Sequence, residues 1–531
     1  MNITEILKTM EDTDLAGQVL CYDIYDKDDP AEVEKVLAEI HPGALYLDKM
    51  SREKIQMYTD MANKYTKIPV AIVTDVEYGP GENMPGLPVL PNVMAWSACD
   101  DENLVEQAAE IMAKICRLHG ISWTLSPVID INMNFNHPAL NIRSASDSPE
   151  QVKKMMGAFL RGIQKNGYMV ATLKHFPGDG VDDRNQHFCT TVNSLSMPEW
   201  SETFGSVYKD LISQGASSVM SAHIGLPAYA GEIDELGAVP AILSKPLMTD
   251  LLKGELGFDG CVISDAMSMV GSVSRSGVEK LAVTFLNCGG DVVLFNEPED
   301  HLRIMNALKG GILSRERLLD AVSRVLKLKN RARLFENQDD VLSEITVTKE
   351  ELMEQLERIG DVIAERSIKF VKDVDHNLPL NAESPKRFLC VNIKDGEMDT
   401  SVVGDELIKR GHKVDVMDNI SHNHLNEIMD QYDYILINNF FSGQHGGSMR
   451  CGWGQIAPFW RGYIFRHPRV IFTSFGDPYK LYDYPFLKTY INTFSYTENS
   501  MRAFVRVLLG ECKMVAKNPV SLPGYFERET Q

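Results

Sequence analysis

The chain has 531 residues, which exceeds the size of one ordinary hydrophobic core and predicts about two or three domains. Hydrophobic residues make up 44% of it and charged residues 24%, which is the composition of a globular protein. Its formal net charge of -21 would repel nucleic acid and an anionic membrane surface, so neither is expected as a partner.

The cysteines and the N-terminal residues indicate the compartment. Nine cysteines are scattered along the chain without a Cys-x-x-Cys pair, and several lie in apolar runs, where free cysteine behaves as a small hydrophobic residue. Residues 1–18 mix acids into a helical pattern and lack the basic and apolar segments of a secretion signal. No apolar run approaches the roughly 18 residues of a membrane span. We therefore expect a cytoplasmic protein with reduced cysteines.

Short apolar runs rich in strand-forming residues alternate with helical patterns from the N-terminus onward. These runs lie at residues 17–23, 43–48, 69–77, 122–131, 170–176, 217–224, 260–267 and 291–297. Strands that alternate with helices indicate βαβ units and a parallel sheet. Eight such strands fit a (β/α)8 TIM-type barrel, which we place at residues 1–340.

Nearly every one of these runs ends in a polar residue able to take part in chemistry. The residues at the run ends are Asp23, Asp48, Asp75, Asp130, Lys174 with His175, His223, Asp265 and Asn296. In a barrel these ends converge on the face where barrel enzymes place their sites. Any single one could be a helix cap, but the whole set predicts an active site at this face.

A second series of strands and helices follows the barrel. Its apolar runs lie at residues 388–393, 413–418, 432–440, 469–476 and 489–495. They predict a smaller α/β/α three-layer sandwich domain over residues 371–531, joined to the barrel by a linker and a connecting helix at residues 341–370. In this domain Trp453, Trp460 and Phe465 could stack on a sugar, but we expect them to form the core of a helix.

Two segments at the predicted face carry the residues that chemistry needs. Lys174 and His175 end the fifth run and would point into the barrel mouth as hydrogen-bond donors, and the loop after them reaches His187. Asp265 ends the seventh run, where a partly desolvated carboxylate can attack an electrophilic carbon. One carboxylate nucleophile and one separate proton donor are the set required for retaining glycoside hydrolysis.

These residues and the motifs around them resemble glycoside hydrolase family 3, and within it the β-N-acetylglucosaminidase (β-hexosaminidase) branch in its two-domain form. The resemblance covers essentially the whole chain. The matching motifs are DVEYG (75–79), NIRS (141–144), KHFPGDG (174–180), VMSAHI (219–224), LGFDG-x-VISDAMSM (256–269), SFGDPY (474–479) and PVSLPG (519–524).

The resemblance implies a role for each matching residue. Asp265 takes the position of the nucleophile that forms the glycosyl-enzyme, and His187 that of an acid/base histidine on a mobile loop. Met269 takes that of an apolar wall. The residues at the positions that hold the non-reducing sugar are Asp75, Arg143, Lys174, His175 and His223.

The acid/base motif departs from the family at one position. The family pairs the histidine with an Asp two residues earlier, and this chain has Asn185 there. An Asp would stabilise the protonated imidazole, whereas Asn orients the ring but supplies no charge. Three interpretations follow: a weakened enzyme, a substitute acid at Asp182 or Asp183, or a chain altered to trap a complex.

The resemblance implies a retaining exo-β-N-acetylglucosaminidase that acts on a small carbohydrate substrate without a metal or organic cofactor. Two alternatives remain open. The first is a β-glucosidase or a glycoside phosphorylase on the same scaffold, because a neutral imidazole would not repel phosphate as a carboxylate would. The second is a non-catalytic sugar-binding protein, which Asn185 makes credible. The oligomeric state is left open.

Overall fold

The computed structural model describes residues 3–380, 384–394, 399–441 and 449–530. The chain divides into two compact units, each of which has its own sheet. Unit 1 comprises residues 1–88, 102–131 and 152–356, and unit 2 comprises residues 89–101, 132–151 and 357–531. The boundaries expected from the sequence at residues 340 and 370 stay a prediction.

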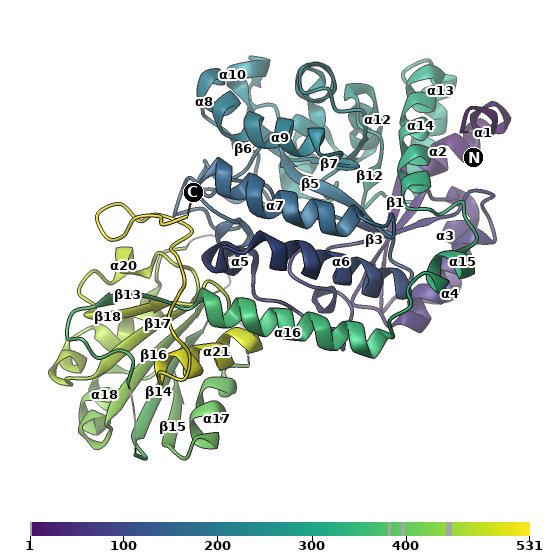
Figure 1. The fold of residues 1–531 in the computed structure, drawn as a ribbon. Helices are drawn as coiled ribbons and strands as arrows, with labels where there is room; N and C mark the ends of the chain where they lie inside the picture. The colour runs from purple at the N-terminus through teal and green to yellow at the C-terminus, as the bar shows by residue number, and fades with distance from the viewer. Residues whose placement is uncertain (1–2, 381–383, 395–398, 442–448, 531) are drawn as a thin grey trace. The chain divides into compact units, whose positions relative to one another are not determined.

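Unit 1 is built on eight parallel strands that follow one another around the sheet in chain order (Figure 1). The strands are β1 (Leu20–Tyr25), β2 (Ala44–Asp48), β3 (Ala71–Thr74), β4 (Trp123–Thr124), β5 (Val170–Phe176), β7 (Ser218–Ser221), β11 (Cys261–Ser264) and β12 (Val293–Leu294). The ring closes where the N–H of Ser264 donates to the Val292 carbonyl at 2.9 Å. The (β/α)8 barrel predicted from the sequence is confirmed.

Helices precede the first strand of unit 1, lie between its strands and follow the last one. They are α1 (Ile3–Thr9), α2 (Asp12–Gln18), α3 (Pro30–Ile40), α4 (Arg52–Asn63), α6 (Glu102–Leu118), α7 (Pro149–Gln164), α8 (Met197–Glu202), α9 (Phe204–Ser213), α10 (Pro227–Ala230), the π-helix η4 (Pro246–Glu255), α11 (Val270–Ser276), α12 (Val278–Cys288), α13 (Glu299–Lys309), α14 (Arg315–Arg331) and α15 (Gln338–Ser343). Local sequence sets their ends: in α3, Asp29 accepts the Ala31 N–H, Pro30 takes the first position, and left-handed His41 terminates the helix.

The interior of the barrel is closed by apolar side chains. Cys21, Val73, Trp123 and Ile263 from four strands pack in one cluster, which also takes in Leu328 of α14. All nine cysteines are free thiols. Cys21 and Cys261 of this cluster are fully buried, as the sequence predicted for cysteines that act as small hydrophobic residues. A filled barrel leaves no room for a site in its interior, so its active site is expected on the loops at the carboxyl ends of the strands.

Unit 2 contains a six-stranded sheet in the order β13-β18-β17-β16-β14-β15. The strands are β13 (Lys369–Asp373), β14 (Arg387–Lys394), β15 (Lys413–Asp418), β16 (Tyr434–Phe441), β17 (Val470–Gly476) and β18 (Thr489–Asn492). All neighbours run parallel except β13, which pairs antiparallel with β18. The sequence did not predict β13, because its charged, half-buried residues lack an apolar run.

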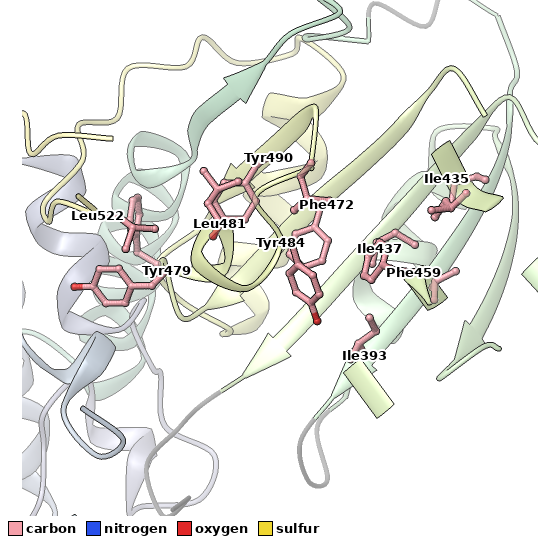
Figure 2. Packing of buried hydrophobic residues seen from close by; sticks show 14 of the residues in the cluster. Ile393, Ile435, Ile437, Phe459, Phe472, Tyr479, Leu481, Tyr484, Tyr490 and Leu522 are labelled. Atoms are coloured by element: carbon pink, nitrogen blue, oxygen red, sulfur yellow. The ribbon is translucent and has the colours of Figure 1, made fainter. Parts of the chain in front are cut away.

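Both faces of this sheet are covered, which makes the unit a three-layer sandwich. The helices are α5 (Val93–Cys99), α16 (Lys349–Ser367), α17 (Ser401–Lys409), α18 (His422–Ile428), α19 (Trp453–Ile456), α20 (Lys480–Asp483) and α21 (Glu498–Leu508). One face packs Ile393, Ile437 and Phe472 into the cluster of Figure 2, and the other face packs Phe388 and Phe440. Among the described helices, none is long and apolar enough to cross a bilayer.

Candidate active site

Asp265 directly follows β11 and is 6% exposed. Its Oδ1 accepts the N–H of Ala266 at 2.8 Å, while its Oδ2 is buried without a hydrogen-bond partner among the residues described. Burial opposes ionisation of this carboxyl, but the imidazoles of His175, His223 and His187 and the Ala266 N–H outweigh burial and lower its pKa. The group is therefore an ionised carboxylate with one free oxygen, which suits a nucleophile.

His223 follows β7 and lies beside this carboxylate. Its ring is fully buried, and Nε2 lies 3.1 Å from the Ala266 carbonyl, so Nε2 carries the proton and donates it. Burial lowers the pKa of His223 more than the nearby Asp265 raises it. The ring is therefore neutral at neutral pH and orients the backbone that holds Asp265. The sugar contact implied for His223 stays a prediction.

His175, at the end of β5, is held by the carboxylate of Asp130. Asp130 is fully buried and lies 2.7 Å from the Nδ1 of His175. The same carboxylate accepts the backbone N–H groups of His175 at 3.1 Å and of Asp179 at 2.8 Å. Nδ1 therefore carries the proton that is donated to Asp130, and Nε2 is the nitrogen left for a ligand. The sequence placed Asp130 at a strand end but did not assign it this role.

Lys174 joins an acidic cluster at the mouth of the barrel. Its Nζ lies 2.7 Å from Asp75 and 2.8 Å from Glu77, and Tyr46 donates to the other oxygen of Asp75 at 2.9 Å. Lys174 is 3% exposed, so the ammonium is strongly oriented. The structure thus brings Asp75 and Lys174 together as the sequence predicted, and adds Glu77 and Tyr46, which the sequence did not single out.

Glu82 supports the turn that follows β3. Its carboxyl accepts the N–H of Glu77 at 2.8 Å and that of Tyr78 at 3.3 Å. Burial, with the neighbouring Glu77 and Asp75, raises the pKa of Glu82 to about 8. The raised pKa favours the protonated form of Glu82, which reduces the repulsion among the acids around the Lys174 ammonium. Only the folded structure reveals this role.

The loop after β5 holds His187 through Asn185. The Asn185 Oδ1 lies 2.6 Å from the His187 Nδ1 and accepts the His187 backbone N–H at 3.0 Å. Asn185 is buried and His187 is half-buried. The amide oxygen thus selects the tautomer with its proton on Nδ1, which makes Nε2 the basic nitrogen of the ring. The amide fixes the ring but brings no negative charge to it.

Asp182, one of the two substitute acids considered from the sequence, is engaged elsewhere. It accepts from the Arg184 side chain at 2.9 Å and from the Val192 N–H at 2.9 Å. Burial opposes ionisation of Asp182, but the bonds from Arg184 and the backbone lower its pKa overall. An ionised, hydrogen-bonded carboxylate is a poor proton donor at neutral pH. Asp183 is exposed on the same loop.

Two further predicted site residues and the aromatic group are carried by other elements of the chain. Arg143 ends the short 3-10 helix η2 (Asn141–Arg143) in unit 2, and its role at the sugar stays a prediction. Met269 is half-buried at the start of α11. The expectation that Trp453 and Trp460 form a helix core is wrong: they are 62% and 59% exposed, with ring centroids 5.2 Å apart.

The sequence of this chain is similar to those of known glycosidases. The sequence pattern of the glycosyl hydrolase family 3 N-terminal domain matches residues 15–328. A β-N-acetylglucosaminidase/β-glucosidase from Cellulomonas fimi is 28% identical, over 97% of this chain and 94% of the relative. A β-hexosaminidase from Stenotrophomonas maltophilia is 34% identical, over 45% of this chain and 69% of the relative.

Solved structures extend the likeness to both units. A β-glucoside phosphorylase, BglX, bound to 2FGlc, superposes with a TM-score of 0.88 at 31% identity, covering 98% of this chain and 96% of the other. A family 3 β-N-acetylglucosaminidase from Paenibacillus has a TM-score of 0.83 at 23% identity, covering 97% and 99%. The second of these bears on the fold alone.

Proposed function

The chain belongs to glycosyl hydrolase family 3. We propose that it is a retaining exo-β-N-acetylglucosaminidase that acts on small glycosides. The observation that carries the proposal is Asp265, a buried, ionised carboxylate with one oxygen held by a backbone N–H and the other free. A separate imidazole, His187, lies on the adjoining loop. The N-acetylglucosaminide as substrate is supported by the Cellulomonas fimi relative.

The first step forms a glycosyl-enzyme. The Oδ2 of Asp265 attacks the anomeric carbon, the glycosidic bond breaks, and the leaving-group oxygen takes a proton from the Nε2 of a protonated His187. Lys174 and His175 hold the sugar hydroxyls, with Asp130 keeping the Nε2 of His175 turned toward them. A hydrogen-bonded, buried set of donors costs little reorganisation when the sugar binds.

The second step releases the sugar. Water attacks the anomeric carbon while the Nε2 of neutral His187 takes its proton, the ester bond to Asp265 breaks, and the sugar leaves with retained configuration. This step needs a neutral imidazole, which the Asn185 amide allows. The first step needs an imidazolium, which the amide does not favour. Substrates with poor leaving groups are therefore expected to react slowly.

A second candidate function is favoured by the contact between Asn185 and His187 and by the structural relative that is a β-glucoside phosphorylase. With Asn185 in place of an acid, the group held against the His187 Nδ1 is a neutral amide rather than a carboxylate. A phosphate dianion could then replace water in the second step, attack the anomeric carbon and leave as a glycosyl phosphate. Charge repulsion at a carboxylate acid/base would oppose this reaction.

The proposed function is tested with aryl glycosides of N-acetylglucosamine, glucose and xylose, each assayed with and without inorganic phosphate. The N-acetylglucosaminide should be turned over fastest, with free sugar as the product in both conditions. A phosphate-dependent rate with a sugar phosphate as product would identify the phosphorylase instead. Binding of the sugars without any turnover would contradict both candidates and leave a sugar-binding protein.

A further inference from the structure

A polar pocket of about 330 Å³ lies in unit 1, away from the candidate active site. It is bordered by Ala216 and Ser217, which precede β7, and by residues 257–260, which precede β11, with α14 forming its remaining side. In a parallel barrel the starts of the strands lie on the face opposite their ends. The pocket is therefore on the far face from Asp265, which follows β11.

Three cations from successive turns of α14 line this pocket: Arg324, Lys327 and Arg331. Of the described residues that line it, Asp259 is the one acid. The lining of the pocket is therefore positively charged, although the chain as a whole has a formal net charge of -21. Such a pocket attracts a small anion rather than the neutral sugar proposed as substrate.

The three cations differ in how far the protein already neutralises them. Arg324 is held by Asp259 at 3.3 Å and Asp320 at 3.3 Å, and it donates to the Gly260 carbonyl at 3.1 Å. Lys327 reaches Asp259 only at 3.5 Å, and Asp259 is 78% exposed, so this pair is weakened by solvent. An anion that enters the pocket can take the place of Asp259 at Lys327.

Arg331 is the cation without a counter-ion. Among the residues that the structure describes, none forms an ion pair or a hydrogen bond with its guanidinium, and burial alone lowers its pKa. Arg331 as a whole is exposed at the rim of the pocket, so a ligand can reach its guanidinium. A Cβ at Gly215 would lie 3.2 Å from its Nη2, so the glycine leaves the guanidinium uncovered on that side. An unpaired guanidinium at the edge of a pocket can bind an anion that offers two oxygens to its planar fork.

We infer that this pocket binds a small phosphate-bearing anion, with Arg331 as the principal contact and Lys327 as the second. Its volume lies at the lower end of ligand pockets, which fits inorganic phosphate or a small phosphomonoester rather than a nucleotide. Because the pocket lies on the opposite face of the barrel, its occupant binds independently of the catalytic residues.

The test is calorimetric titration of inorganic phosphate into the full-length protein, at an ionic strength kept constant with chloride. R331Q should bind phosphate at least about tenfold more weakly, and K327Q should weaken binding in the same direction. R331Q should keep the wild-type turnover and Tm, because Arg331 contacts no acid in the described chain and lies away from Asp265. Tighter binding of glycerol 2-phosphate than of phosphate would support an organic phosphate as occupant.

The matched control is R52Q, which removes an equal charge from an exposed position at the start of α4. R52Q should bind phosphate as the wild type does. Three results would overturn the inference: no phosphate binding by the wild type, equal binding by R331Q, or equal weakening by R52Q and R331Q. If phosphate binds only at the active site, where it would accept the sugar, R331Q should bind it as tightly as the wild type does.

Discussion

At the scale of single residues, the candidate mechanism depends on the free oxygen of Asp265. D265N removes the charge that attacks the anomeric carbon while keeping the size of the side chain. We expect turnover to fall by at least about 10³-fold on both activated and poor leaving groups, because a better leaving group relieves only the need for an acid. The measurement is kcat/KM on two aryl N-acetylglucosaminides, and near-normal hydrolysis would remove Asp265 from the role.

Asn185 sets a second residue-scale prediction. N185D should raise kcat/KM on poor leaving groups by roughly 10-fold to 10³-fold, because a carboxylate favours the imidazolium that donates the proton. The limb of the pH–rate profile that reports this acid should move to higher pH, because the His187 ring keeps its proton up to a higher pH. H187A should harm poor leaving groups far more than activated ones. No change in N185D, with H187A affecting both substrates equally, would make Asp183 the candidate acid.

At the scale of elements, the loop that carries His187 rests on the first turn of α11. A Cβ at Gly271 would lie 3.0 Å from the backbone carbon of Cys189 and 3.2 Å from the Thr190 nitrogen. Backbone atoms cannot move aside as a flexible side chain can, so any larger residue must displace the loop. Thr190 also donates to the Gly271 carbonyl at 3.2 Å.

G271A should therefore reduce the acid/base contribution of the loop. We expect kcat/KM on a poor leaving group to fall by about 10-fold or more, with a smaller effect on an activated one, because proton transfer needs close placement of the imidazole. S274A, at an exposed position on the same helix, is the control. Equal loss on both substrates in G271A would instead indicate general damage to the site.

Helix α14 contains a buried lysine that gives a stability prediction. Lys329 is fully buried and donates to Gln18 at 2.7 Å, and burial lowers its pKa from 10.5 to about 7. Between these two values the unfolded chain binds a proton that the folded chain does not. The contribution of Lys329 to stability therefore rises with pH across this window, by up to about 1.4 kcal/mol per pH unit.

K329M removes this titration. The Tm of the wild type relative to K329M should increase as the pH is raised from about 7 to about 9, because the cost of keeping the amine neutral disappears. Lys309, exposed at the end of α13, supplies the control K309M, which should show no such trend. A pH-independent difference between the wild type and K329M would show that Lys329 is not strongly perturbed.

At the scale of the whole molecule, the two units are not consecutive in sequence. Residues 89–101 and 132–151 belong to unit 2, although barrel segments flank them along the chain. Met94, Ala98 and Ile142 from these segments are 0%, 1% and 2% exposed within the cluster that contains Ile437. The core of unit 2 is therefore completed by side chains from the first part of the chain.

A chain truncated after residue 356 would expose those side chains. We expect the truncated protein to have a lower Tm and to aggregate, because an exposed apolar patch favours association. Replacing the exposed Met57 by Ser in the full chain gives a control for a surface change. A soluble truncated protein with the wild-type Tm for its barrel would show that these segments do not need unit 2.

Several features could be predicted from the sequence because they depend on neighbours along the chain. The run at 170–176 forms β5 over those same residues, and the run at 413–418 forms β15, since strand formers flanked by breakers define their own limits. Asn185 and His187, two residues apart, make the contact that their spacing indicates. The order of the barrel strands follows from the alternation of strands and helices.

Other features were decided only by the tertiary structure. Burial in the folded barrel raises the pKa of Glu82, with Glu77 and Asp75 adding to the effect, and the pairing of β4 with β5 brings Asp130 to His175. The antiparallel strand β13 forms because β18 offers it an edge, and Trp453 is exposed although its sequence is apolar. The physical reason is the same in each case. Strand and helix patterns arise from local backbone geometry, whereas desolvation and charge depend on residues distant in the chain.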